Sequence, residues 1–397
     1  MTATDSVLTP AVSKATAYSV IALIAFNLRL AITSVPSVLE DIELATGWSD
    51  VTLGALTGIP VLCMGIFALA IPRWAARYGM PILIHIGIIV MLAAMLLRGF
   101  QNLPLLLFPS AFLAGAAIAI LGGLVPALVR SVLAQSMGTA SIIWTTSMFI
   151  GAALGGAVTP YLAYWTGSWG FSLSFWIIPV LIAGVAWWSS GNLGHARPPT
   201  PVTSRLRDLP WRSWPAWALT AYIVLNSIVY YSAVAWLAPS YVDLGYSQEQ
   251  AGTLFGFFIL GSIISGTVFP WLMNRWSARR ALLSISALGG AIGLVVIAFV
   301  PLAAPELILF VFGFFLSGSF AMTLALLSEY GADIAGSARL TAMVFFVTYT
   351  VAATGPIVSG FLYEITASWM SSFLILAISL AAQVLFVAPL RKGVVIH

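Results

Sequence analysis

Twelve apolar stretches of about 16 to 26 residues follow one another through the chain, each bounded by glycine, proline or charged residues. A helix needs about 20 apolar residues to cross the hydrocarbon core of a bilayer. The pattern therefore predicts an all-α integral membrane protein with twelve transmembrane helices. The stretches cover residues 15–38, 51–71, 82–97, 104–129, 141–161, 171–190, 214–239, 250–272, 281–300, 305–327, 340–362 and 370–390.

The composition excludes a water-soluble protein. Of the 397 residues, 7% are charged and 61% are hydrophobic, whereas soluble domains carry about 25% charged residues. No polar stretch approaches the roughly 50 residues of the smallest domains, so we expect no appended catalytic domain. The net charge is +4, but the basic residues are scattered between apolar runs. We therefore expect the lipid bilayer, and no nucleic acid, around this chain.

Cysteine and histidine are too few for a metal or catalytic cluster. Cys63 is the single cysteine, and the three histidines are scattered. One cysteine forms no intramolecular disulfide and no CxxC metal site. An enzyme needs clustered nucleophile, base or metal ligands. We expect no enzymatic activity and no cofactor or metal. A membrane-embedded enzyme or a channel is a remote alternative to a transporter.

The charges predict how the spans are oriented. Cytoplasmic loops of membrane proteins carry an excess of Lys and Arg. With both termini in the cytoplasm, Arg98 is the one basic residue placed outside, while Arg29 falls within a span. We expect a monomer of the plasma (inner) membrane, with residues 1–14 lacking the basic segment of a cleavable signal. The inside residues are Lys14, Arg73, Arg77, Arg130, Arg197, Arg205, Arg207, Arg212, Arg275, Arg279, Arg280, Arg339, Arg391 and Lys392, and the outside carboxylates are Glu40, Asp41, Glu43, Asp50, Asp243, Glu249, Glu306 and Glu364.

The two halves of the chain share a pattern at an offset of 198 residues, close to half its length. Residues 49–58 and 247–256 match at a serine, a leucine and two glycines, and the same offset pairs Arg77 with Arg275. Two halves in the same topology are typical of parallel-repeat transporters, and chance matching of glycine-rich helices is the alternative. We predict pseudo-symmetric six-helix bundles at 1–190 and 214–397, joined by a cytoplasmic linker at 191–213.

Five motifs carry a resemblance to a known family. Together they resemble the major facilitator superfamily and, within it, the porters of cyanate and 2-nitroimidazole. The resemblance implies two six-helix halves that rock around a central site. The motifs are Asn27-Leu28-Arg29-Leu30-Ala31-Ile32-Thr33-Ser34-Val35, Ile59-Pro60-Val61-Leu62-Cys63, Leu96-Leu97-Arg98, Gly122-Gly123-Leu124-Val125-Pro126-Ala127 and Gly355-Pro356.

One signature of that superfamily is incomplete. The loop after the second span has the family form G-x-L-A-D-R-x-G-R-R, and here it keeps Arg77 and Gly79 but lacks the aspartate. The second copy has Arg275 preceded by Asn274. The resemblance implies that Arg77 and Arg275 take part in gating, without the usual acidic partner.

Arg29 is the charged residue that lies deepest in a predicted span. It comes about 14 residues into the first span, about 21 Å along a helix, which is too deep to reach the surface easily. An arginine at the centre of a membrane helix costs about 2.5 to 3.5 kcal/mol. One interpretation is a guanidinium that binds a small anion or a nitro group in the central cavity. The other is a structural arginine that bonds carbonyls freed near Pro36 or pairs with a distant carboxylate.

The second half offers aromatic and polar residues at a similar depth. Aligning Pro36 with Pro239 places Ser232 opposite Arg29 and Tyr230 opposite Asn27. Packing is the alternative role for the aromatic side chains. The predicted binding residues are Arg29, Asn27, Asn226, Tyr230, Tyr231, Trp236 and Tyr349.

No aspartate or glutamate lies near the middle of a predicted span. Proton-driven transporters usually carry such a residue, so we expect facilitated diffusion, anion exchange or coupling through a proton on the substrate. Glu329 and Asp333 share a helix face at the inner end of the tenth span. We expect them to pair with Arg130 or Arg339 across the cytoplasmic mouth when it closes. Solvated loop charges are the alternative.

Small residues and prolines mark the spans expected to move. Glycines four residues apart permit close helix contact, although packing alone would also explain them. The pairs are Gly54 with Gly58, Gly151 with Gly155 and Gly252 with Gly256, and the prolines expected to kink spans are Pro36, Pro60, Pro126, Pro160, Pro239 and Pro356.

These observations favour a secondary transporter of a small anionic or polarised solute such as cyanate, nitrate, nitrite or a nitroimidazole. It would work by alternating access around Arg29. The alternative is a proton-coupled multidrug efflux antiporter, which the aromatic content and the glycine-rich fifth span favour and the missing core carboxylates disfavour.

Overall fold

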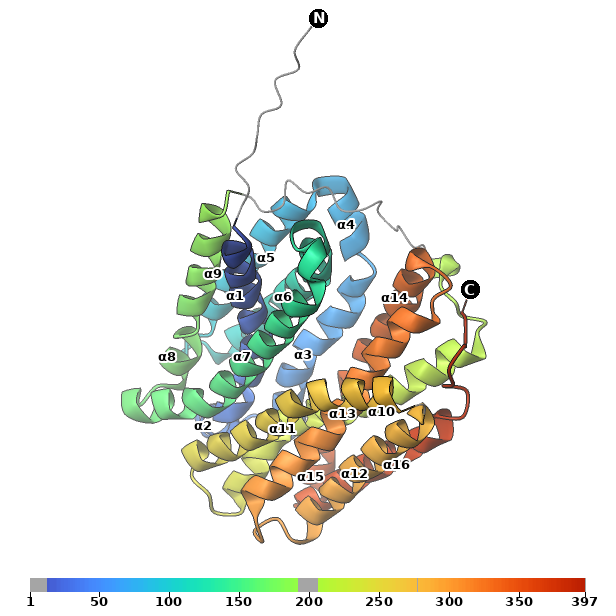
Figure 1. Cartoon of the computed structure of the whole chain (residues 1–397). Coiled ribbons are helices and arrows are strands. Elements are labelled where there is room, and N and C mark those ends of the chain that lie inside the picture. The colour runs from blue at the N-terminus through green and yellow to red at the C-terminus, as the bar shows by residue number, and fades with distance from the viewer. Residues whose placement is uncertain (1–12, 192–205, 277, 397) are drawn as a thin grey trace, which may run out of the picture.

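The computed structural model describes residues 13–191, 206–276 and 278–396, and these fold as a bundle of helices (Figure 1). The described residues contain twelve helical spans long and apolar enough to cross a membrane, some of them built from two consecutive helices, which confirms the predicted fold class. The central part of the predicted linker, 192–205, lies outside the described residues. The first half contains α1 (Lys14–Thr33), α2 (Leu39–Thr46), α3 (Asp50–Ala68), α4 (Ile71–Tyr78), α5 (Met80–Leu97), α6 (Leu107–Val132), α7 (Met137–Thr166), α8 (Trp169–Ser174) and α9 (Ile177–Ser189). The second contains α10 (Trp214–Asp243), α11 (Gln248–Arg275), α12 (Arg279–Phe299), α13 (Pro305–Tyr330), α14 (Ile334–Ala352), α15 (Thr354–Thr366) and α16 (Trp369–Ala382).

Three spans are interrupted, each shortly before a proline. Proline lacks an N–H, and its ring collides with the carbonyl four residues earlier. Accordingly, α1 ends three residues before Pro36, α8 and α9 are separated four residues before Pro179, and α14 ends four residues before Pro356. The break before Pro179 was not among the expected kinks. The other four prolines expected to kink spans lie inside continuous helices: Pro60, Pro126, Pro160 and Pro239.

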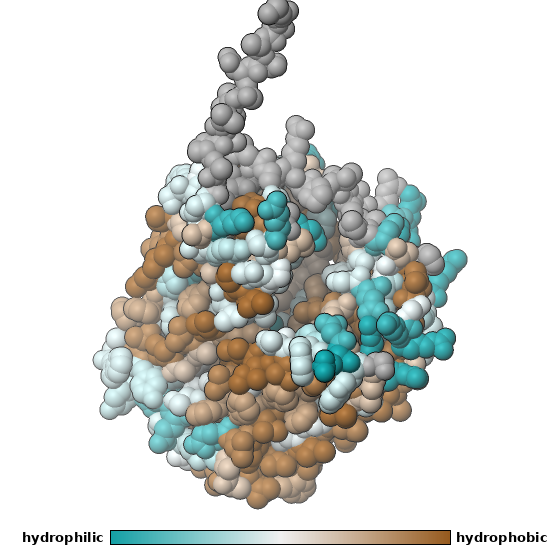
Figure 2. Space-filling view, viewed as in Figure 1, coloured by the Kyte–Doolittle hydropathy of each residue, from teal (hydrophilic) through white to brown (hydrophobic). Residues whose placement is uncertain are grey.

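The outer helices of each half present apolar side chains to the bilayer. Ile89 on α5, Val185 on α9, Ile292 on α12 and Ile378 on α16 are each more than 60% exposed. Figure 2 shows brown apolar side chains over much of the flank of the molecule. In water this surface would aggregate, whereas hydrocarbon covers it at no cost. The inner helices α1, α3, α7, α10, α11, α14 and α15 therefore remain to form the contact between the halves.

The two halves meet tightly at one end, here called the closed end and marked by Asp41, Asp50, Gln248 and Glu364. Gln248 Nε2 donates to Glu40 Oε2 at 3.0 Å and to Asp41 Oδ1 at 3.2 Å, and the Val51 N–H donates to Glu364 Oε1 at 2.8 Å. Each bond joins a residue of the first half to one of the second.

The other end, here called the open end, holds the start of α1 and the turn between α13 and α14. On α1, Ser19 is exposed, and Ala22, Phe26 and Arg29 are half-buried at three- and four-residue spacing. Exposure along this face stops at Arg29, because Thr33, one turn further, is buried. Figure 2 shows a hollow between the halves at this end. The hollow therefore reaches inward from the open end to Arg29.

Candidate functional site

Arg29 projects from α1 toward the other half and meets Tyr230 on α10. The guanidinium carbon lies 4.8 Å from the centre of the Tyr230 ring, within the range of a cation–π contact. Tyr231 and Tyr349 also lie close enough to interact electrostatically with the guanidinium. Both halves thus contribute to one group at the inner limit of the hollow, here called the arginine–tyrosine cluster: Arg29, Tyr230, Tyr231 and Tyr349.

The three tyrosines form a connected set of rings. Tyr230 and Tyr231 are perpendicular with centroids 5.3 Å apart, and Tyr231 contacts Tyr349 of α14 at 6.2 Å. Edge-to-face packing of this kind is favourable and holds the rings in defined positions. The Tyr231 hydroxyl points to Met64 Sδ on α3 at 4.0 Å. Four helices, α1, α3, α10 and α14, therefore converge on the cluster.

The cluster leaves hydrogen-bonding groups without partners. Arg29 Nη1 and the Tyr230 hydroxyl are buried and have no hydrogen-bond partner among the described residues. Arg29 also forms no ion pair within this part of the chain. A desolvated cation–π contact contributes about 2 kcal/mol, which does not offset the insertion cost and the unmade hydrogen bonds. An anionic or polarised ligand would supply the missing acceptor for Arg29.

Two of the predicted binding residues point elsewhere. Asn27 is two residues from Arg29, hence about 200° around the helix, and its Nδ2 donates to Pro179 O on α9 at 3.1 Å. The Trp236 ring N–H donates to Pro356 O on α15 at 2.7 Å, and its ring packs on Trp369. Both therefore join helices to each other. Asn226 is buried, one turn from Tyr230 on the same face of α10, and its Oδ1 has no described partner.

Arg98 is a second arginine of the interior: it directly follows the last residue of α5, where the third predicted span ends, but its side chain turns into the bundle. It is 1% exposed. Nη2 donates to Ala31 O at 3.0 Å and Nη1 donates to Ser34 Oγ at 3.2 Å. Arg98 therefore binds a carbonyl at the interrupted end of α1, which is the structural role that remained open for Arg29 in the sequence. The motif Leu96-Leu97-Arg98 was the available signal.

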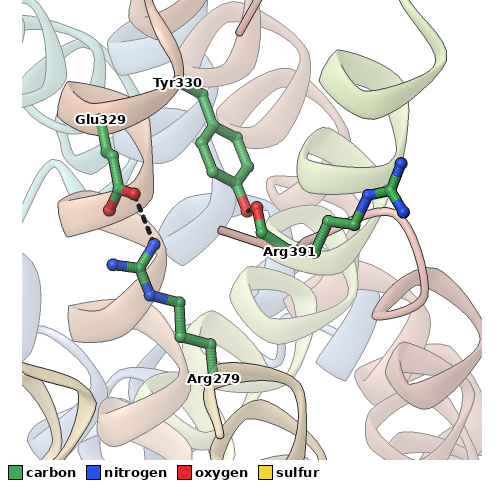
Figure 3. Close-up of polar contacts among 4 residues, drawn as sticks. All are labelled: Arg279, Glu329, Tyr330 and Arg391. Atoms are coloured by element: carbon green, nitrogen blue, oxygen red, sulfur yellow. Dashed lines mark hydrogen bonds and ion pairs between the residues drawn. The ribbon is translucent and has the colours of Figure 1, made fainter. Parts of the chain in front are cut away.

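The predicted gate residues gather at the open end. Glu329 forms an ion pair with Arg279 of the same half at 2.6 Å (Figure 3), so its partner in this conformation is neither Arg130 nor Arg339. Asp333 accepts a hydrogen bond from the Gly336 N–H at 2.6 Å and caps α14. The remaining gate residues also lie at this end: Arg77 on α4, Arg130 on α6, Arg275 on α11 and Arg339 on α14.

Small residues bring the halves into backbone contact at the closed end. A Cβ added at Gly58 of α3 would lie 2.5 Å from Ala353 O, and one at Gly252 of α11 would lie 2.7 Å from Gly156 O on α7. Gly256, the other member of the predicted pair, has open space around it. The close approach of the two halves therefore depends on individual glycines and does not require both members of a glycine pair.

Comparisons with known proteins show which proteins this chain is similar to. The family model described as Major Facilitator Superfamily matches residues 18–338 and 238–394. The cyanate transport protein CynX of Escherichia coli (strain K12) is 28% identical over 355 residues, covering 88% of this chain and 91% of the relative. A 2-nitroimidazole transporter of the same organism is 28% identical over 352 residues, covering 88% of each chain.

A solved structure supports the fold. The crystal structure of a D-xylose-proton symporter superposes with a TM-score of 0.71, at 16% sequence identity, covering 96% of this chain and 97% of the symporter. At this identity the likeness concerns the arrangement of helices and carries nothing about the solute.

Proposed function

The chain belongs to the major facilitator superfamily, so it is a multi-pass membrane transporter rather than an enzyme, and we propose that it moves a small anionic or polarised solute past Arg29. Cyanate and 2-nitroimidazole, the solutes in the names of its two relatives, are the first candidates. One is a small anion, and the other carries a polarised nitro group on a planar ring. Both present acceptors that match a guanidinium.

The observation that carries the proposal is the unpartnered Nη1 of Arg29 beside the Tyr230 ring. The structural task near Pro36 already belongs to Arg98. Arg29 thus retains a free donor at the inner limit of the hollow, in contact with the other half. A solute bound there would touch both halves, which alternating access requires.

The distribution of charge supports an orientation. Most arginines of both halves lie at the open end, and most carboxylates lie at the closed end. By the positive-inside rule the open end is cytoplasmic, both termini are inside, and this conformation is inward-open. We place the protein in the plasma (inner) membrane as a monomer. With tyrosines rather than a carboxylate beside Arg29, we expect uniport, exchange, or coupling through a proton on the solute.

A ligand-stabilisation experiment tests the site. Purified protein is heated with cyanate, nitrate, nitrite or 2-nitroimidazole, for wild type, Arg29→Lys and Arg29→Gln. We expect at least one solute to raise the melting temperature of wild type, with a smaller shift for Arg29→Lys and the smallest shift for Arg29→Gln. The control is Tyr241→Phe, which removes a buried hydroxyl that donates to Pro301 O at 3.2 Å, near the closed end. Equal shifts in wild type and Arg29→Gln would remove Arg29 from the site.

A further inference from the structure

Arg98 extends from the end of α5 into the bundle and reaches the last turn of α1. Its Nη2 bonds Ala31 O and its Nη1 bonds Ser34 Oγ, while Nε has no partner among the described residues. Pro36 has no N–H to offer Ile32 O, so the backbone ladder of α1 fails at this turn. A guanidinium is a forked donor that can bridge two acceptors across such a break.

The same turn of α1 carries Arg29. Arg29 and Ala31 are two residues apart, so they lie about 200° apart around the helix. Arg98 therefore holds α1 from the face opposite the one that presents Arg29 to Tyr230. Thr33 fixes this turn to α7 through Ala152 O at 2.9 Å, and Asn27 fixes the preceding turn to α9. Three neighbouring helices, α5, α7 and α9, thus restrain α1 around the turn that carries Arg29.

A hydrophobic residue at position 98 would pack in this apolar surrounding without the desolvation that a charged group suffers. An apolar side chain, however, has no N–H to donate to Ala31 O. The positive charge of Arg98 also lies near the C-terminal end of α1, where the helix dipole favours a cation. Both features act on the position of α1, and neither requires Arg98 to touch the solute.

We propose that Arg98 is a positioning residue for transport: it fixes the interrupted end of α1 and thereby the direction in which Arg29 meets the solute. The inference rests on the proposed role of Arg29. It predicts that loss of Arg98 weakens solute binding through Arg29, beyond any general loss of stability.

A double-mutant cycle separates positioning from stability. Dissociation constants for cyanate and 2-nitroimidazole are measured by equilibrium binding to purified wild type, Arg98→Met, Arg29→Gln and the double variant, below the melting temperature of each. We expect Arg98→Met to weaken binding about tenfold or more. In the Arg29→Gln background it should cause no further loss. Arg98→Lys, which restores one donor, should recover part of the affinity.

Ser34→Ala provides a second route that keeps the arginine. It removes one acceptor of Arg98 and should weaken binding less than Arg98→Met does. Its matched control is Ser110→Ala, a buried serine whose hydroxyl bonds Leu107 O of its own turn. If Arg98→Met and Ser34→Ala bind like wild type while Arg29→Gln does not, Arg98 is structural and the proposed function stands. If Arg29→Gln binds like wild type, or if wild type binds neither solute, both proposals fail.

Discussion

At the scale of single residues, the interior of this protein contains two arginines, Arg29 and Arg98, whose contacts differ. Arg98 has neutral protein acceptors for its terminal nitrogens, whereas Arg29 has an aromatic face and an unpartnered nitrogen. Depth within a predicted span identified Arg29, whereas the burial of Arg98 at the end of α5 was not predicted. The partners, which come from distant segments, separate a residue that stabilises a helix end from one available to a solute.

Among the aromatic residues, a variant of Trp236 distinguishes a side chain that stabilises the fold from one that binds the solute. Trp236→Phe removes the N–H that donates to Pro356 O, so we expect the free energy of unfolding to fall by about 1 to 3 kcal/mol. Solute affinity should stay unchanged, because the ring packs on Trp369. Thermal unfolding and equilibrium binding measure the two effects. A large loss of affinity at unchanged stability would return Trp236 to the binding site.

At the scale of helices, contact at the closed end depends on how near two backbones come. Gly252→Leu would place a side chain against Gly156 O and Pro160, so we expect the closed end to separate and the population to shift toward the outward-open form. Gly256→Leu, one turn along the same face, meets open space and serves as the control.

The shift is measurable as a distance between spin labels at the closed end, one on each half, in a Cys63→Ser background. An increased distance is expected for Gly252→Leu and no change for Gly256→Leu. Equal distances in both variants would show that the α7–α11 contact does not limit closure.

The C-terminal segment adds a contact that no helix pattern predicts. The Ile396 N–H donates to Tyr330 O at 2.7 Å, and Ile396 O accepts from the Ala332 N–H at 3.3 Å. The Tyr330 hydroxyl also donates to Arg391 O at 3.2 Å (Figure 3). These bonds supply partners at the end of α13, where the next residue, Gly331, is extended.

We expect Ile396→Asp to lower the melting temperature of the protein, because the substitution buries a charge where Ile396 is 3% exposed. Val395→Asp changes the neighbouring residue, which is 54% exposed, and should have little effect. Thermal unfolding of both variants makes the comparison. Similar stability in the two would mean that the tail does not hold the α13–α14 turn.

At the scale of the whole molecule, alternating access requires the open end to close. In the conformation described, Glu329 pairs with Arg279 within its own half. In the outward-open form we expect it to pair with Arg130 across the mouth or with Arg339. Exposed pairs contribute up to about 1 kcal/mol, which is enough to bias an equilibrium between two states of similar energy.

A charge exchange tests the pairing with Arg130. Glu329→Arg should slow transport and favour the inward-open form, and Arg130→Glu in the same protein should restore part of the rate. The rates are measured as solute uptake into proteoliposomes, with Arg280→Glu as a second-site control at the same end. If Arg280→Glu restores the transport rate to the same extent as Arg130→Glu does, the net charge at the open end controls its closing, and no specific ion pair is required.

The sequence by itself determined the membrane environment, the number of spans and the depth of Arg29, because these follow from local hydropathy and from charges along the chain. The internal offset of 198 residues also indicated two related halves. Most helix ends followed from the same local signals. The interruption before Pro179 is local too, since it arises from the missing proline N–H.

The tertiary structure alone decided which side chains meet. Asn27 and Arg29 are neighbours in the chain but lie on opposite faces of α1, while Tyr230 reaches Arg29 from the other half. Arg98 ends the third predicted span, and its contact with Ala31 O of α1 appears only in the folded chain. Such contacts depend on helix rotation and on packing between distant segments, which local patterns do not specify. The proposed binding site therefore depends on the assembly of the two halves, whereas the membrane-spanning helices follow from the chain itself.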